Sequence, residues 1–489
     1  MTGTRISIER GSAKPLYRQL REALEHEIAV GALDPSLPLP SSRELARELG
    51  VSRNTVNTAY LELEAEGFVE AVERRGLFVN EEMLSELNRA ETEPRQARPV
   101  DWSAHLAPSP DAHVPEIAKV RDWHRYPYPF VAGQIDPSSF PRLAWARALR
   151  EALEPPNLHY SLRDGIDEDD PYLVEELCRH VLPARGIEVD PDQVLVTLGS
   201  QQGLDLLAHA LVRPGDEVVV ENPGYPDARH IFLRAGARLR PVDVDGSGLV
   251  PPEDLAGVRL LHLTPSHHSP TNVTLSIARR RHLLAQAAAD DALIIEDDYD
   301  SEFRYQGSPT PALKALPDSD RVIYLGTFSK FLAPGLRLGY LVAAPELVRN
   351  LRRQRRYQVR HAAGHTQRAM ALLIASGQYH RTVRRRRTNL ARGWSTLRDA
   401  LNEHLPWTVD APPGGVSIWV PGPPELDCVD LAQKALARGV VIERGDVYFA
   451  DPQANRNHLR LGFAAIDTEA VRPGVAILGE LVRRQLGND

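Results

Sequence analysis

One segment of the chain reads Arg321-Val-Ile-Tyr-Leu-Gly-Thr-Phe-Ser-Lys330-Phe-Leu and continues as Ala-Pro-Gly-Leu-Arg337-Leu-Gly-Tyr. Its apolar first half predicts a buried strand, which ends among small hydroxyl residues and glycine and presents a single lysine, Lys330. Thr327, Ser329 and Arg337 are residue types that hold a phosphate. A lysine presented in this way is typical of proteins that bind pyridoxal phosphate (PLP), whose aldehyde is attacked by the lysine amine. The plain alternative is a solvated strand end.

A second short apolar strand is predicted upstream, where the chain reads Ala292-Leu-Ile-Ile-Glu-Asp297-Asp-Tyr299. The PLP ring needs an anion beside its pyridine nitrogen to keep that nitrogen protonated, and Asp297 at the strand end supplies one. Tyr299 lies two residues further on, and therefore on the same strand face, from which it can donate to the phenolate oxygen of the ring. Taken alone, Asp297 could equally be a helix cap.

Two further pieces precede these strands. The run Val194-Leu-Val-Thr-Leu-Gly-Ser200-Gln201 predicts a strand, a tight turn and a helix start, whose backbone N–H groups make an anion site. The run Glu221-Asn-Pro-Gly-Tyr225-Pro places one aromatic ring in a rigid turn, where it can stack on a cofactor ring. Singly, these pieces also fit a simple turn and a core aromatic; their order along the chain favours a PLP site.

From about Asp122 to the C-terminus, the order of these motifs resembles a fold-type I PLP-dependent aminotransferase, and within that fold the MocR-type regulators of the GntR superfamily. The resemblance implies an α/β fold, with a mostly parallel sheet covered by helices and a smaller C-terminal α+β part. It implies that Lys330 forms the Schiff base and that Arg460 binds a ligand carboxylate. The implied cofactor contacts are Ser200, Gln201, Tyr225, Asp297, Tyr299, Thr327, Ser329, Lys330 and Arg337.

One loop departs from the family pattern. Where many members read Thr-Pro-Ser-His-Gln-Phe-Pro-Thr-Gly, this chain has Thr264-Pro-Ser-His-His268-Ser269-Pro-Thr-Asn272. In related folds the loop lies against the phenolate side of the cofactor, so we expect His268, with Arg460, to contact the effector. The change could reshape effector choice or alter only a turn.

The first eighty residues predict a winged helix-turn-helix. Residues 15–30 carry leucine and isoleucine at four-residue spacing, which gives one apolar stripe. Residues 39–60 read as helix, turn at Gly50 and second helix, with Ser42 and Ser52 as expected N-caps. Residues 68–79 alternate and reverse at Arg75-Gly76, as a two-stranded wing does.

The runs Leu-Pro-Ser-Ser-Arg and Ser-Arg-Asn-Thr-Val resemble those of the GntR-type winged helix, which implies binding to double-stranded DNA. Polar residues at the start of a second helix reach base edges, and a basic wing tip reaches phosphate or the minor groove. The alternative is a helical hairpin that only dimerises. The predicted DNA contacts are Arg43, Arg53, Asn54, Thr55, Asn57 and Arg75.

Composition sets limits on these assignments. The net charge is −8 over 489 residues, and residues 1–80 hold ten lysines and arginines against twelve acids, so DNA binding has to rest on a local basic face. Two cysteines are too few for a disulfide framework, and no apolar run is long enough to span a membrane, which favours the cytoplasm. The acidic run 164–170 and the arginine-rich runs 352–356 and 384–387 are expected on solvated faces.

The expected domains are a DNA-binding domain at 1–80, a linker at 81–121 and a PLP-binding effector domain at 122–489. The resulting hypothesis is a PLP-dependent transcriptional regulator. It binds promoter DNA, is expected to be a homodimer, and senses an amino compound through formation of an external aldimine, with no metal and no membrane partner. One alternative is a working aminotransferase whose winged helix is vestigial. Another is a DNA-binding protein whose PLP is purely structural.

Overall fold

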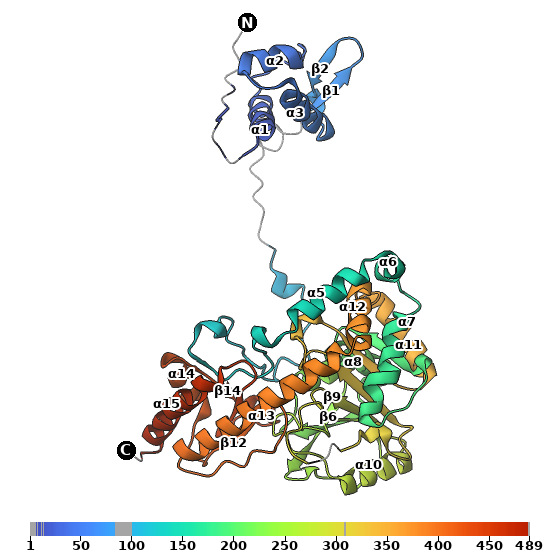
Figure 1. Cartoon of the computed structure of the whole chain (residues 1–489), viewed down its shortest axis with the longest axis vertical. Coiled ribbons are helices and arrows are strands. Elements are labelled where there is room, and N and C mark those ends of the chain that lie inside the picture. Colours follow the sequence, from blue (N-terminus) through green and yellow to red (C-terminus); the bar gives the residue numbers. More distant parts are fainter. Residues whose placement is uncertain are drawn as a thin grey trace. The chain divides into compact units, whose positions relative to one another are not determined.

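The computed structural model describes residues 6, 8–10, 12, 14–83, 100–307 and 310–487. The chain forms two compact units, Met1–Ala107 and Pro108–Asp489, each with its own core (Figure 1). Among the described residues, no helix is both long and apolar enough to cross a membrane. No cluster of three or more histidine, cysteine or acidic side chains suited to a metal occurs in this described part.

In its described residues, the first unit packs the helices α1, α2 and α3 with a β-hairpin, as the sequence predicts. The apolar stripe of its first helix supplies Leu20, Leu24 and Ile28 to a core that also contains Val56 and Leu63. The hairpin strands pair antiparallel, with Val69 opposite Val79. The elements are α1 (Leu16–Ala29), α2 (Ser42–Leu49), α3 (Arg53–Ala65), β1 (Val69–Val72) and β2 (Gly76–Val79).

One predicted helix cap is wrong by a residue. The side chain of Ser41, not Ser42, accepts a hydrogen bond from the Glu44 backbone, and the Glu44 carboxylate accepts one from the Ser41 backbone in return. This reciprocal capping box needs an acid three residues after the cap, and Glu44 stands at that spacing from Ser41. The cap predicted at Ser52 is confirmed, because its hydroxyl accepts from the Thr55 backbone.

The second unit is built on an eight-stranded sheet of order β4-β11-β10-β9-β8-β5-β6-β7 (Figure 1). The central strands run parallel, while β11 is antiparallel to both of its neighbours. The strands are β4 (Val194–Thr197), β5 (Glu217–Asn222), β6 (Arg238–Asp245), β7 (Gly248–Leu249), β8 (Val258–Leu263), β9 (Leu293–Asp298), β10 (Val322–Thr327) and β11 (Gly339–Val342).

Helices cover both faces of this sheet. One face packs against α8 (Ser200–Leu211), α9 (Pro226–Arg234) and α11 (Pro345–Gln358). The other face packs against α10 (Ile277–Ala289) and a helical layer. That layer contains α5 (Arg142–Ala152), α6 (Pro155–Leu162), α7 (Pro171–Glu176) and α12 (Gly364–Ala375). Because parallel strands are buried on both faces, they read as the continuous apolar runs seen in the sequence.

The C-terminal part is a smaller α+β layer. Its antiparallel sheet has the order β12-β15-β14, from β12 (Ser417–Pro421), β15 (His458–Gly462) and β14 (Glu443–Arg444). The helices are α13 (Gln378–His404), α14 (Cys428–Ala437) and α15 (Thr468–Leu486), and a separate short pair joins β3 (Tyr128–Pro129) to β13 (Val440–Val441). The predicted fold class is confirmed in both of its parts.

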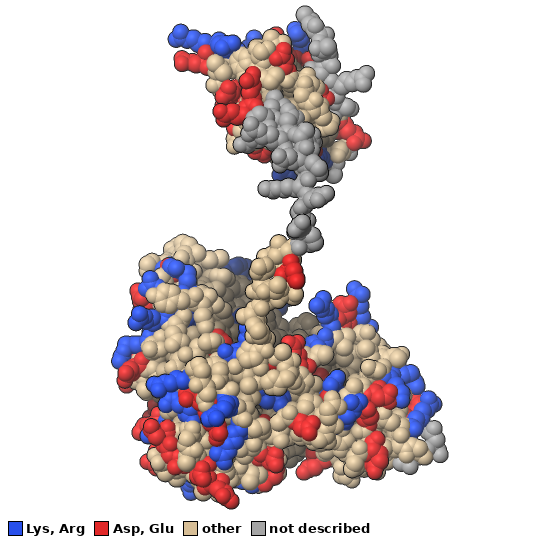
Figure 2. All heavy atoms as spheres, turned by 180° about the vertical axis from the view of Figure 1, so that it is seen from behind, with Lys and Arg blue, Asp and Glu red and all other residues tan. Residues whose placement is uncertain are grey.

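The three charged runs that were predicted to be solvated are all partly buried. Asp169 accepts from the buried Arg355 at 2.6 Å, and Asp170 accepts from Arg368 at 2.8 Å. Arg386 is also buried and donates to the Phe331 carbonyl at 2.6 Å. These residues are far apart in the sequence, so periodicity alone gave no sign of their pairing. Elsewhere on the second unit, basic and acidic side chains are interspersed over the face shown in Figure 2.

The second unit begins at Pro108, inside the segment predicted as linker. We call residues 108–121 the strap. The buried Asp111 lies 2.9 Å from His230 Nδ1 on α9, and Ile117 packs against an aromatic cluster. That cluster consists of Trp419, Val447, Tyr448 and Phe449.

Candidate functional site

Lys330 lies just beyond β10, where the sequence places it, and its side chain is half-buried. Its Nζ is 5.9 Å from the centre of the Tyr299 ring. Burial first, and then the positive charges of Arg460 and Lys119, lower the pKa of Lys330 to about 8. A lysine with this pKa holds a substantial neutral fraction near pH 8, and the neutral amine is the nucleophile.

Asp297 and Tyr299 lie at the end of the neighbouring strand β9, and both are buried. Asp297 Oδ2 is 3.6 Å from His262 Nε2. Within the described residues, neither Asp297 Oδ1 nor the Tyr299 hydroxyl has a hydrogen-bond partner. Buried polar groups in proteins are normally paired, so an acceptor and a donor left open beside a lysine fit a polar ring bound between them.

The start of α8 forms the opposite end of the site. Gly199 precedes it with a φ of 93°, a conformation that favours glycine, and Ser200 and Gln201 are the first helical residues. Arg337 donates to the Leu198 carbonyl at 2.7 Å, and its guanidinium would lie 3.3 Å from a Cβ at Gly199. The arginine and the helix N-terminus therefore meet, as a phosphate site requires.

Hydroxyl groups and one ring complete this end. Thr327 donates to the Ser329 hydroxyl at 3.1 Å. Tyr225 stands just before α9 and donates to Asp227 at 2.9 Å, and the Gln201 amide donates to the same carboxylate oxygen at 3.3 Å. The sequence prediction missed Asp227, although its place two residues after Tyr225 in the first turn of a helix was a usable signal.

Arg460 lies on β15 and is held by side chains from the two neighbouring strands and from the loop between β14 and β15. Its Nε donates to the Ser417 hydroxyl at 2.9 Å, and its Nη1 donates to the Tyr448 hydroxyl at 2.8 Å. Glu443 lies 3.9 Å away. Burial lowers the pKa of the Arg460 guanidinium, but Tyr448 and Glu443 outweigh it and raise that pKa above its usual value. Arg460 therefore stays charged, and none of its three neighbours was predicted from the sequence.

His268 is buried, and its Nδ1 lies 2.7 Å from the Thr271 hydroxyl. Burial lowers the pKa of His268 to about 3, so the ring is neutral. Its Nε2 is 3.7 Å from Glu221, and burial raises the pKa of that carboxyl to about 8. The Thr264 hydroxyl donates to the same Glu221 oxygen at 2.6 Å. The histidine thus belongs to a buried network beneath the site.

Asn272 has a direct structural role in the unusual loop. Its φ of 62° is left-handed, which explains why many relatives of this pattern carry glycine there. Its side-chain amide donates to the Ser417 carbonyl, and the Ser417 hydroxyl is the group that accepts from Arg460. The asparagine that departs from the family pattern therefore contacts Ser417, and Ser417 in turn contacts Arg460, the predicted effector arginine.

In the first unit, the predicted DNA contacts fall into two groups. Arg43, Arg53, Asn54 and Arg75 are exposed, whereas Thr55 and Asn57 are half-buried. The Thr55 hydroxyl is 2.8 Å from the Ser52 cap. Arg53 Nε donates to the Ser42 hydroxyl at 3.3 Å, which holds this arginine at the start of α3. The four exposed residues are therefore the ones whose side chains are accessible to a partner.

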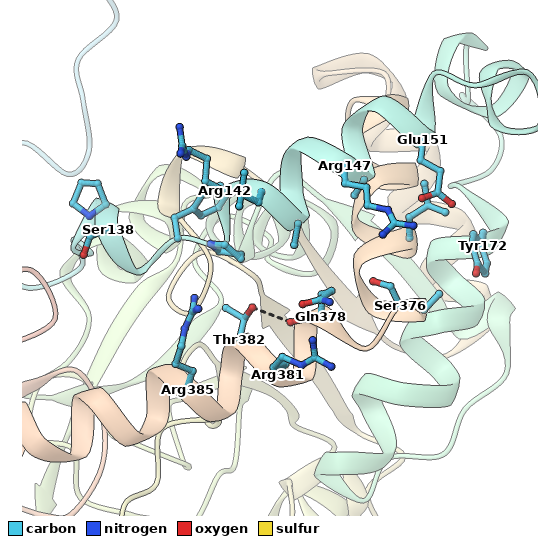
Figure 3. A pocket seen from close by; sticks show the side chains of 18 residues that line it. Ser138, Arg142, Arg147, Glu151, Tyr172, Ser376, Gln378, Arg381, Thr382 and Arg385 are labelled. Atoms are coloured by element: carbon cyan, nitrogen blue, oxygen red, sulfur yellow. Dashed lines mark hydrogen bonds between the residues drawn. The ribbon is translucent and has the colours of Figure 1, made fainter.

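A separate pocket of about 1000 Å³ lies among α5, α12 and α13 (Figure 3). It is lined by arginines from two helices, and the Thr382 hydroxyl donates to the Gln378 carbonyl at its floor. Its basic residues are Arg142, Arg147, Arg381 and Arg385. It contains none of the predicted site residues, so the size of this hollow does not mark the cofactor site.

Comparison with known proteins defines the class. The family model for bacterial regulatory proteins of the gntR family matches residues 16–79, and the model for aminotransferase class I and II matches residues 136–478. The kynurenine aminotransferase of Pyrococcus horikoshii superposes with a TM-score of 0.72 at 27% identity, covering 79% of this chain and 98% of its own. The chain therefore joins a GntR-type DNA-binding domain to a class I and II aminotransferase domain.

Full-length relatives carry the same combination. The HTH-type transcriptional regulator TauR of Rhodobacter capsulatus is 40% identical, over 97% of this chain and 98% of its own. The probable rhizopine catabolism regulatory protein MocR of Rhizobium meliloti is 32% identical, over 96% and 94%. The chain belongs to the MocR-type transcriptional regulators of the GntR family, and the resemblance seen in the sequence is confirmed. Its GntR domain implies DNA binding.

Proposed function

We propose that this regulator binds PLP at Lys330 and senses a small amino compound there, and that it does so as a homodimer on promoter DNA. The observation that carries the proposal is geometric. Lys330 follows β10, its Nζ lies 5.9 Å from the centre of the Tyr299 ring, and the open acceptor of Asp297 and the open donor of Tyr299 stand at the end of the adjacent strand β9. The finer roles of the site residues are part of the proposal.

Each residue has a task that its position supports. When bound, PLP supplies an aldehyde that condenses with primary amines and a ring that withdraws electrons. Lys330 provides the neutral amine, Asp297 holds the proton on the pyridine nitrogen, and Tyr299 donates to the phenolate oxygen. Tyr225 covers one ring face. Ser200, Gln201, Thr327, Ser329 and Arg337 bind the phosphate.

The effector presents its amine where Lys330 stands and its anionic group to Arg460. A planar guanidinium recognises a carboxylate or a similar anion through two parallel hydrogen bonds. His268, neutral and buried beside Glu221, shapes the floor of this region rather than carrying a charge to the ligand. Regulation requires binding and a change of conformation, and it does not require the ligand to be turned over.

Homodimerisation is supported by exposed leucines on neighbouring helices. Leu143 on α5 is 78% exposed and Leu162 on α6 is 70% exposed. An apolar side chain this exposed loses its contact with water when a second copy covers it, which favours association. Size measurement of the full chain in solution tests this part of the proposal.

The main experiment is replacement of Lys330. We expect the purified protein to absorb visible light and to retain the cofactor covalently after borohydride reduction. Lys330→Ala should fold but lose covalent cofactor. Lys314→Ala is the matched control, because burial lowers the pKa of Lys314 as well but the residue lies outside the site. Covalent cofactor that remains on the Lys330→Ala variant would overturn the assignment.

A second candidate function, turnover as an aminotransferase, is favoured by the same lowered pKa, since a neutral Lys330 can also act as a base on the ligand carbon. The two functions differ in rate. We expect production of 2-oxo acid to fall well below the typical enzyme median of about 10 per second. Steady turnover at that rate, unaffected by deletion of residues 1–80, would make the chain an enzyme.

A further inference from the structure

Glu443 stands directly opposite Arg460 in the ladder between β14 and β15. Cross-strand partners project from the same face of a sheet, so the carboxylate and the guanidinium face one another across 3.9 Å. The Tyr448 hydroxyl bridges them, because it accepts from Arg460 at 2.8 Å and donates to Glu443 at 3.2 Å. This arrangement gives the arginine a resident negative partner.

The pair is enclosed. Arg460 and Glu443 are each 9% exposed, and Tyr448 is fully buried. Burial raises the pKa of Tyr448, which keeps its hydroxyl protonated and able to bridge. Water screens buried charges poorly, so Glu443 acts strongly on anything that approaches Arg460.

We propose that Glu443 is a specificity-determining residue of the effector site. It compensates the charge of Arg460, so amine-free anions and ligands with two anionic groups bind weakly. A compound with one anionic group binds tightly only when its amine also engages the Lys330 side of the site, because the anionic group alone contributes too little binding free energy. The effector class is therefore a singly anionic amino compound. This inference rests on the proposed function for the role of Arg460.

The test uses the full-length protein and calorimetric titration with four probes: acetate, succinate, β-alanine and aspartate. Glu443→Gln removes the charge but keeps an oxygen that accepts from Tyr448. We expect it to tighten acetate binding roughly tenfold and succinate binding more, since each carboxylate of the probe is relieved of a like charge. In the same variant, the affinity for β-alanine should increase least, and the affinity for aspartate should increase more than that for β-alanine.

Three variants make the result specific. Glu217→Gln removes a carboxylate from another arginine pair, 3.4 Å from Arg240, at the start of β5 and thus at the other end of that strand from Tyr225; it should change nothing. Glu443→Asp keeps the charge and should keep anion binding weak. The increase in affinity for acetate and succinate should vanish when Glu443→Gln is combined with Arg460→Gln.

The proposal is overturned if Glu443→Gln leaves acetate and succinate binding unchanged, or if the gain survives without Arg460. The acetate and succinate titrations require neither cofactor nor DNA. If the protein proves colourless, or if no amine changes its binding to DNA, the proposed function is refuted. The acetate and succinate titrations can still be interpreted in that case.

Discussion

Four charged groups adjust the pKa of Lys330, and with it the reactivity of its amine. Arg460 and Lys119 lower its pKa, and Asp300 and Glu443 raise it. Asp300 is itself paired with His267, at 2.9 Å from its Nδ1. Since burial is the largest cause of the lowered pKa, the four charges adjust a value that the enclosed position already sets.

We therefore expect the reaction of the Lys330 amine with an added aldehyde to speed up as the pH rises through about 8. Arg460→Gln removes a positive charge, raises this pKa and moves the profile to higher pH. Glu443→Gln removes a negative charge and moves it to lower pH. The measurement is the rate of visible absorbance change on mixing with PLP at a series of pH values. Equal profiles for both variants would contradict this electrostatic account.

At the scale of elements, we expect α3 and the wing to contact different parts of the DNA. Arg53 is exposed at the start of α3, and Arg75 is exposed beside the hairpin turn with its guanidinium 5.2 Å from the Phe78 ring centre. A helix start reads base edges, whereas a wing tip contacts backbone or minor groove.

Arg53→Ala should cost roughly 1–3 kcal/mol of affinity for the cognate promoter and much less for unrelated DNA. Arg75→Ala should weaken binding to both about equally and reduce the salt slope by about one. Titrations of full-length protein with both DNAs at several salt concentrations measure this. If the two variants lose the same share of specificity, the assignment of roles is wrong.

Most elements were predictable from the sequence because their apolar periodicity is strong. The strand β6 was not predicted, since its residues Arg238–Asp245 alternate charged, apolar and proline positions and leave it half-exposed near the sheet edge. The antiparallel direction of β11 was also invisible, because direction depends on pairing with β10 and β4, and no local pattern records it.

The candidate site was predictable only in part, for the same reason. Lys330, Asp297 and Tyr299 lie at or just beyond the ends of the neighbouring parallel strands β10 and β9, and parallel strands bring their ends together. Glu443 was missed because its role depends on a partner in another strand, Arg460. Asp227 had a local signal, its place in the first turn of α9, but its contact with Gln201 on another helix was not predictable. Register and packing create such pairs, and a single sequence does not show them.

At the scale of the whole molecule, the proposed function joins two binding events on one chain. If the effector changes the affinity for DNA by some factor, DNA must change the affinity for the effector by the same factor. We expect titration of the effector in the presence and absence of promoter DNA to give this equality. Lys330→Ala should abolish both changes. Equal affinity for the effector with and without promoter DNA would rule out coupling between the two sites.

The strap brings a charged residue of its own, Lys119, to the proposed cofactor site. Its Lys119 and the site lysine both lie against Gly133, where a Cβ would be 4.0 Å from one amine and 3.3 Å from the other. Asp111 and Ile117 hold the same segment on the second unit, and the chain continues from it to the first. The strap thus places a positive charge of its own beside the reactive amine, and this charge lowers the pKa of Lys330. A sequence change that shifts residues 108–121 on this unit therefore alters the fraction of Lys330 that is neutral, although it replaces no residue of the site itself.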